Sequence, residues 1–396
     1  MVSKTTIAFL ILLACTCYLV APWIFEKKLL FNELLAGTGF LLLAYHRFRI
    51  GKDLISVCII MIIVWGVFHM ITSLFLMDRL YYYLRNLVII YSMMSFFVGY
   101  FLLKYLDVFL RKTGVFMKTY IVTLLILPLN SFIFDRFSTA TIFPAVLKDV
   151  KNFLLPWLLI TMNIIHAFTY ESSTAILVAG FFCLLFISPG YKFFKQVVLL
   201  MFVSFICLFI YLLPYLDLIK DHYSPYTETG IYDVINSHPL LSVDGNSTWR
   251  LVLWKQIIVD NFPRNLFGYG FGTPMISYYP VEDFSKVESL PYILGAHNSF
   301  VYLFGRLGIV YLLLIVPVYI NILKEYFYHK QYYLRNNQSL IFLSFFAITV
   351  ISLFNPTLES PIYSGGYWLL LGFTARCIHN RIYLTAHRTN ESFVYT

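Results

Sequence analysis

The stretch from Leu54 to Leu76 reads LISVCIIMIIVWGVFHMITSLFL and contains no charged side chain. An α-helix needs about 20 consecutive, mostly apolar residues to cross the hydrocarbon core of a bilayer. A strand of a membrane β-barrel would instead alternate apolar and polar residues over about 10 positions. This continuous apolar run therefore predicts a transmembrane helix.

Apolar runs of this kind recur along the chain, in which 60% of the residues are hydrophobic and 12% are charged. That composition excludes a water-soluble globular protein. The sequence contains eleven such runs: Thr5 to Ile24, Leu29 to Tyr45, Leu54 to Leu76, Leu87 to Leu103, Thr119 to Phe134, Phe153 to Thr169, Ser173 to Ser188, Val197 to Leu216, Ser299 to Leu323, Leu340 to Phe354 and Gly366 to Arg376.

The basic residues, which give a net charge of +9, cluster in the short connectors between these runs. Such clusters mark cytoplasmic loops and contact anionic lipid, so the charge does not indicate a nucleic-acid partner. By this rule residues 217–296 form a large external loop, within a single membrane domain that covers residues 1–396. Eight runs precede that loop, an even number that would leave it inside, so we expect a further crossing between Phe134 and Phe153. The predicted fold is all-α, with about 12 transmembrane helices and short helices in the external loop.

One helix of the external loop is predicted from Trp249 to Val259, capped by Ser247 or Thr248. Its apolar positions follow the helical period, and Pro263 lies beyond its end. We expect this helix to lie on the membrane surface, with Arg250 and Lys255 near the lipid headgroups.

His297 lies where the chain re-enters the membrane, and Asn298 and Ser299 follow it. Both following residues are helix-capping types. In one interpretation the three residues only cap and anchor the incoming helix. In the other, His297 is a general base or a group that orients the acceptor, because an imidazole titrates near physiological pH.

Arg306 lies nine residues after His297, inside the same apolar run. An arginine at that depth must face protein or water, and a functional role is the default expectation. The structural alternative is an ion pair with Glu359 or Glu171.

Arg250 also has two interpretations, a cation–π pair with Trp254 one turn later, or phosphate binding through its planar fork of donors. Gly268, Gly270 and Gly272 allow the backbone to approach a ligand closely. They do not form a dinucleotide fingerprint, because no strand is predicted before them.

Several catalytic motifs are missing from the sequence. It has no Walker loop, no Gly-x-Ser-x-Gly elbow and no His-Glu-x-x-His pair, so ATP hydrolysis, serine esterase chemistry and zinc proteolysis have no support. These features favour chemistry without a metal or cofactor.

Three motifs follow one another in the last part of the chain: Trp249-Arg-Leu-Val-Leu-Trp254, Leu266-Phe-Gly-Tyr-Gly-Phe-Gly272, and His297-Asn-Ser-Phe with Gly305 and Gly308. Their order and their expected external position resemble the C-terminal signature of the bacterial O-antigen ligase and polymerase (Wzy-type) superfamily. The resemblance covers roughly residues 170 to 375.

The resemblance implies an inner-membrane glycosyltransferase that acts at the periplasmic face on oligosaccharides linked to undecaprenyl diphosphate. It implies that Arg250 engages the diphosphate and that His297 is needed for transfer. We expect supporting contacts to the substrate from Arg306, Arg136, Asn298, Gly268, Tyr269 and Gly270. The expected partners are the carrier-linked oligosaccharide, membrane lipids and a chain-length regulator protein.

The sequence departs from the ligase pattern at Ser172-Ser173-Thr174-Ala175, where a serine stands in place of an arginine. This difference favours a repeat-unit polymerase over a ligase that transfers glycan to lipid A core. A carrier-lipid flippase is the alternative from another class. It would place polar groups and discontinuous helices at the bilayer midplane, whereas here the polar residues cluster at one surface.

Overall fold

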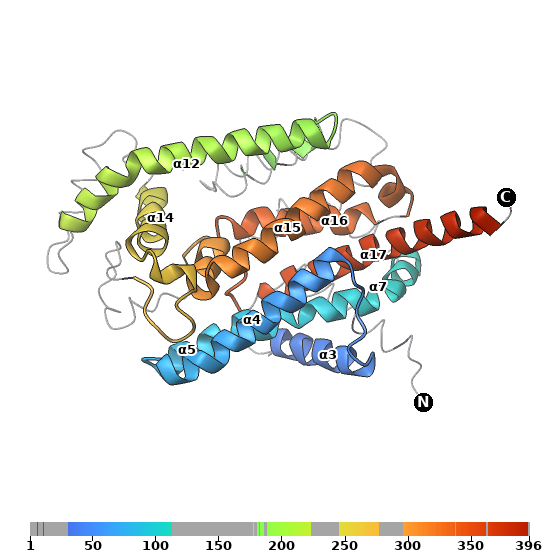
Figure 1. The fold of residues 1–396 in the computed structure, drawn as a ribbon, viewed down its shortest axis with the longest axis horizontal. Coiled ribbons are helices and arrows are strands. Elements are labelled where there is room, and N and C mark those ends of the chain that lie inside the picture. Colours follow the sequence, from blue (N-terminus) through green and yellow to red (C-terminus); the bar gives the residue numbers. More distant parts are fainter. Residues whose placement is uncertain are drawn as a thin grey trace, which may run out of the picture.

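A computed structural model describes residues 31–112, 188–222, 245–276 and 296–394, except 337 and 362, together with residues 6, 11, 177, 180, 181 and 183–185. Within these residues every regular element is helical (Figure 1). The longer helices are α3 (Phe31–Tyr45), α4 (Leu54–Leu76), α7 (Ser95–Lys112), α12 (Tyr191–His222), α14 (Gly245–Lys255), α15 (Ser299–Arg335), α16 (Ser339–Ser352) and α17 (Ser364–Val394). The shorter ones are α5 (Leu80–Asn86), α6 (Val88–Met93), the π-helix η1 (Gln256–Asp260) and the 3₁₀ turn η2 (Arg264–Leu266).

Four segments of the described chain are long and apolar enough to cross a membrane: Leu54–Leu76, Leu80–Leu103, Tyr191–Leu216 and Ser299–Tyr333. The predicted all-α fold is confirmed for the described residues, and these four helices have the length and composition of membrane crossings. The total of about 12 crossings remains a prediction. The runs Thr5 to Ile24, Thr119 to Phe134 and Phe153 to Thr169, and the expected crossing between Phe134 and Phe153, lie outside or almost wholly outside the described residues.

Helix α4 shows how the sequence sets the ends of a crossing. The side chain of Asp53 caps the helix, because Oδ1 accepts from the Ser56 amide at 2.9 Å and Oδ2 accepts from the Ser56 hydroxyl at 2.9 Å. At the other end Met77 is extended and terminates the helix. Ile55, Ile59 and Ile62 are fully buried along one face, so only that face packs against the rest of the protein.

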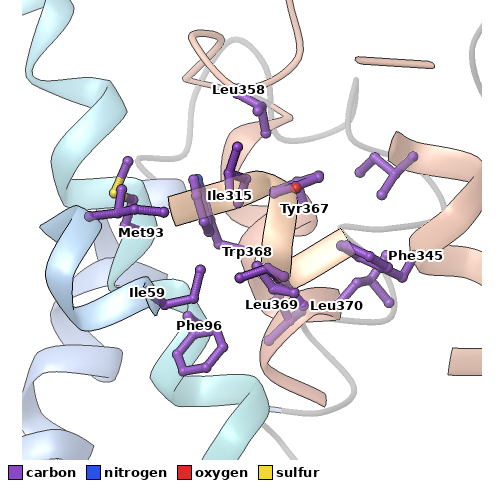
Figure 2. Close-up of a cluster of buried hydrophobic side chains, with 14 of the residues drawn as sticks. Ile59, Met93, Phe96, Ile315, Phe345, Leu358, Tyr367, Trp368, Leu369 and Leu370 are labelled. Carbon is purple, nitrogen blue, oxygen red and sulfur yellow. The ribbon is translucent and has the colours of Figure 1, made fainter. Parts of the chain in front are cut away.

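The core of the bundle lies where α7 and α17 pack together, with α4 and α15 beside them. Figure 2 shows Phe96 of α7, Ile59 of α4 and Ile315 of α15 around Trp368 and Leu369 of α17. All five side chains are almost completely buried. Because lipid is as apolar as this core, close van der Waals packing of these side chains, rather than their removal from water, fixes the helices that carry the site.

Two helices lie at the margins of this core. In Figure 1, α12 runs along one edge of the bundle, and α14 stands across one end of it. Most side chains of α12 are exposed in the described structure, which suits contact with lipid. The first turn of α15 lies at the same end of the bundle as α14.

Helix α14 differs from the helix predicted for the external loop. It begins at Gly245, so Ser247 and Thr248 lie inside it, and it passes into η1 after Lys255. Lys255 is 3% exposed and its Nζ lies 2.6 Å from Oδ1 of Asp260. The expectation that this lysine lies among lipid headgroups is therefore wrong, because the helix packs into the protein and the buried cation pairs with an internal acid.

Candidate functional site

Helix α15 is interrupted at Gly308, whose backbone angles are φ 72° and ψ −165°. Such a break frees the carbonyls of the preceding turn, and free carbonyls are costly inside a membrane. Here Gly305 O accepts from the Tyr269 amide at 2.8 Å, Arg306 O accepts from the Gly270 amide at 3.0 Å, and Leu307 O accepts from Trp65 Nε1 at 2.7 Å. Trp65 lies at the middle of α4, so the interruption lies near the middle of that crossing.

The loop that fills the break is the glycine-rich segment 268–272, which the sequence places outside the membrane. Gly268 and Gly308 lie against each other, and both have positive φ. A Cβ at Gly308 would lie 2.7 Å from the amide nitrogen of Gly268 and 2.5 Å from the carbonyl carbon of Phe267. The glycines therefore permit a backbone-to-backbone contact with α15, whereas the approach to a ligand expected from the sequence stays a prediction.

Replacement of Gly308 by alanine should destabilise the protein by about 2 kcal/mol or more. A side chain at this φ and ψ is strained by about 1–3 kcal/mol, and its Cβ also meets the backbone of residues 266–268. Thermal unfolding of the purified protein in detergent measures the effect. Gly37→Ala in α3 is the matched control, because a Cβ there meets nothing within 4 Å. Equal unfolding midpoints for the two variants would contradict the account of the break.

Arg306 holds the glycine-rich loop from inside the protein. It is completely buried, and its Nη1 donates to Gly270 O at 3.1 Å and to Thr273 O at 2.7 Å. Its guanidinium carbon lies 5.3 Å from the centre of the Tyr302 ring. Arg306 therefore pairs with backbone carbonyls and not with the carboxylate considered from the sequence. Its Nε and Nη2 have no hydrogen-bond partner among the described residues.

Asn86 joins the loop to α15 from the other side. Its Nδ2 donates to the Tyr302 hydroxyl at 2.8 Å, and its Oδ1 accepts from the Gly272 amide at 3.1 Å. The hydroxyl of Ser73 accepts from the Phe271 amide at 2.8 Å. The loop is thus held in one conformation by buried polar groups of three helices.

The turn before α15 carries His297 in a left-handed conformation, with φ 49°. Oδ1 of Asn298 accepts from the amides of Phe300 at 3.0 Å and Val301 at 3.1 Å, so the predicted cap is confirmed for this residue. Ala296 O accepts from Trp254 Nε1 at 2.8 Å. Since Trp254 lies one helical turn after Arg250, this bond fastens α14 to the histidine turn.

Arg250 and His297 lie close enough to interact through charge. Burial lowers the pKa of His297, and the positive charge of Arg250 lowers it further, to about 4. The imidazole is therefore neutral at pH 7 and able to accept a proton. The guanidinium of Arg250 is half-buried beside it, and together they place an anion-binding group next to a base.

A buried carboxylic acid, Glu359, lies behind this turn. Its Oε2 is 2.5 Å from the hydroxyl of Ser299, the first residue of α15. Burial raises the pKa of Glu359 to about 8, and the bond from Ser299 opposes this rise. The sequence interpretation considered Glu359 only as a partner of Arg306, and its position in a short polar connector between two apolar runs gave no signal of a buried role.

The structure brings together Arg250, His297 and Asn298 among the residues predicted for the site. Gly268, Tyr269 and Gly270 lie deeper, against Arg306, and the Tyr269 ring also stacks under Arg264 at 4.9 Å. Arg136 lies outside the described residues. The sequence interpretation missed Asn86, Trp65, Ser73 and Tyr302, whose only signal was a polar atom within an apolar run.

Residues 157–316, about two fifths of the chain, match the family model described as O-Antigen ligase. The match spans all three motifs and confirms the resemblance to the O-antigen ligase and polymerase superfamily. Neither the comparison with curated proteins nor the comparison with solved structures gave a match.

Proposed function

From the match to the O-antigen ligase family and the adjacent Arg250 and His297, we propose that this protein is a membrane glycosyltransferase. It joins oligosaccharide repeat units carried on undecaprenyl diphosphate into a longer glycan at the periplasmic face of the inner membrane. The observation that carries the proposal is the placement of a guanidinium beside a neutral, half-buried imidazole at one end of the bundle.

The proposed reaction is a single inverting displacement without a metal. The acceptor hydroxyl oxygen attacks the anomeric carbon of the donor, and the bond from that carbon to the diphosphate oxygen breaks. The electron pair leaves with undecaprenyl diphosphate, whose growing charge Arg250 stabilises, as cationic groups do at transferring phosphates. The proton of the acceptor hydroxyl passes to His297, which is neutral at pH 7.

The diphosphate also sets when His297 becomes an effective base. In the free protein the charge of Arg250 opposes protonation of the imidazole. A bound diphosphate brings negative charge beside both groups and raises the pKa of His297 toward its ordinary value. The histidine is thus most basic when the donor substrate is present.

One feature of the structure is shared with a flippase: α15 is discontinuous near the middle of the bundle. Discontinuous helices in transporters present freed carbonyls to ions or substrate. In this chain the carbonyls of Gly305, Arg306 and Leu307 each accept from Tyr269, Gly270 or Trp65. The interruption therefore serves internal packing, which favours the enzyme.

Reconstitution separates the polymerase from the ligase. We expect the purified protein in proteoliposomes, given only undecaprenyl-diphosphate-linked repeat units, to produce a ladder of longer carrier-linked glycans. A ligase would leave these units unchanged and would transfer single units once lipid A core is added. Transfer to lipid A core without any ladder would contradict the polymerase assignment, and the products are separated by gel electrophoresis and mass spectrometry.

A further inference from the structure

The loop between α16 and α17 is fastened to the first residue of α15. The hydroxyl oxygen of Ser299 accepts from the amides of Thr357 at 2.8 Å and Leu358 at 3.0 Å. The same oxygen lies 3.0 Å from Asn355 O and 2.5 Å from Oε2 of Glu359. One serine side chain therefore contacts four groups of this loop.

The loop has a second anchor in the core. The Leu358 side chain is 1% exposed and belongs to the main hydrophobic cluster. Figure 2 shows it beside Ile315 of α15 and Tyr367 of α17. The loop thus cannot shift without either breaking the contacts of Ser299 or emptying part of the core.

Hydrogen-bond accounting indicates the protonation state of Glu359. A serine hydroxyl has two lone pairs and one proton, and the two backbone amides occupy both lone pairs of Ser299. The proton then goes to Oε2 of Glu359, the nearest acceptor. Oε1 has no partner among the described residues, and a buried carboxylate in that position would leave a charge uncompensated. A neutral acid avoids this buried charge while its Oε2 still accepts from Ser299, in agreement with the pKa, which burial raises to about 8.

We propose that Glu359 is a positioning residue for His297, because it holds Ser299 and thereby the turn in which the imidazole lies. The inference rests on the proposed glycosyl transfer and adds a residue to it. Ser299 is two positions from His297, and the positive φ of His297 must be maintained by its surroundings. A displacement of about 1 Å of a catalytic group can cost about 10²-fold in rate.

Several groups face Glu359 within the described structure. Tyr302 and Tyr311 of α15 lie close enough to interact with it electrostatically. Tyr302 is itself beside Arg306, and Tyr311 is near Tyr367 of α17. The change expected at this site between pH 7 and 9 is the ionisation of Glu359 itself.

The first test is Glu359→Ala in the reconstituted full-length protein at pH 7, with donor concentration varied. We expect kcat to fall about 10- to 100-fold and KM for the donor to change less than about threefold, because Arg250 still binds the diphosphate. Glu359→Gln should keep kcat within about threefold, since glutamine has the shape of a neutral glutamic acid and can still accept from Ser299.

The pH profile distinguishes positioning from simple support of the fold. In the natural protein we expect kcat to fall as pH rises through about 8, because an ionised Glu359 is costly in its buried position and the loop that carries it must shift toward water. Glu359→Gln should remove this alkaline fall. Glu325→Gln replaces a half-buried acid in the second half of α15 that pairs with Arg381; it is the matched control and should retain the fall.

The outcomes separate this inference from the proposed function. Unchanged kcat in Glu359→Ala, or an alkaline fall that persists in Glu359→Gln, would overturn the positioning role and leave glycosyl transfer intact. If Glu359→Ala fails to fold, the pH profile of Glu359→Gln decides the question. If the proposed catalytic mechanism is itself wrong, a different result is expected: turnover stays complete after replacement of His297.

Discussion

Replacement of His297 by alanine is expected to lower turnover by about 10²–10⁴-fold, the usual contribution of a general base. The neutral imidazole beside Arg250 is the group placed to take the proton of the acceptor hydroxyl. Binding of the carrier-linked donor should persist, because the arginine remains. Initial rates of glycan elongation in proteoliposomes measure the loss, and donor binding is followed by stabilisation against thermal unfolding.

The matched control is His329→Ala. His329 is partly exposed and lies near the far end of α15, the helix that begins two residues after His297. This variant should elongate glycans at the natural rate. If His297→Ala also retains more than about a tenth of the natural rate while folding normally, His297 is not the base and the mechanism is wrong.

Replacement of Arg250 by alanine should lower kcat/KM by about 10²-fold or more. Each hydrogen bond to a charged group contributes about 1.5–3 kcal/mol, and a guanidinium can make two to a diphosphate. Arg250→Lys should also be impaired, by about tenfold, because an ammonium keeps the charge but lacks the bidentate fork. Arg335→Ala, an exposed arginine at the other end of α15, is the matched control and should leave kcat/KM unchanged.

The same substitution should change the titration of His297 in a known direction. Arg250 lowers the pKa of His297, so its removal raises that pKa from about 4 toward the ordinary value of 6.5. Diethyl pyrocarbonate modifies neutral imidazole. As the pH is lowered, His297 of the natural protein should therefore stay reactive down to about pH 4. In Arg250→Ala its reactivity should be lost at a higher pH, because the imidazole becomes protonated earlier. Identical profiles would show that the two side chains do not interact.

The helices were largely predictable because a membrane crossing must be continuous and apolar. The run from Leu54 to Leu76 coincides with α4, and the run beginning at Ser299 coincides with the start of α15. The cap at Asn298 was also predictable, since a short polar side chain satisfies free amides at a helix start. The pairing of Lys255 was not, because Asp260 lies five positions later and comes next to it only where the chain forms the π-helix η1.

The sequence by itself determined that the chain is helical, that it has apolar helices long enough to cross a membrane, and that Asn298 caps the helix that follows it. These features depend on local composition and on neighbouring residues. Only the tertiary structure decided that α15 breaks at Gly308, that a distant glycine-rich loop fills the break, and that Glu359 lies behind His297. The reason is that freed carbonyls and buried acids need partners 36 to 242 positions away in the chain, and no local pattern specifies which distant residue supplies them.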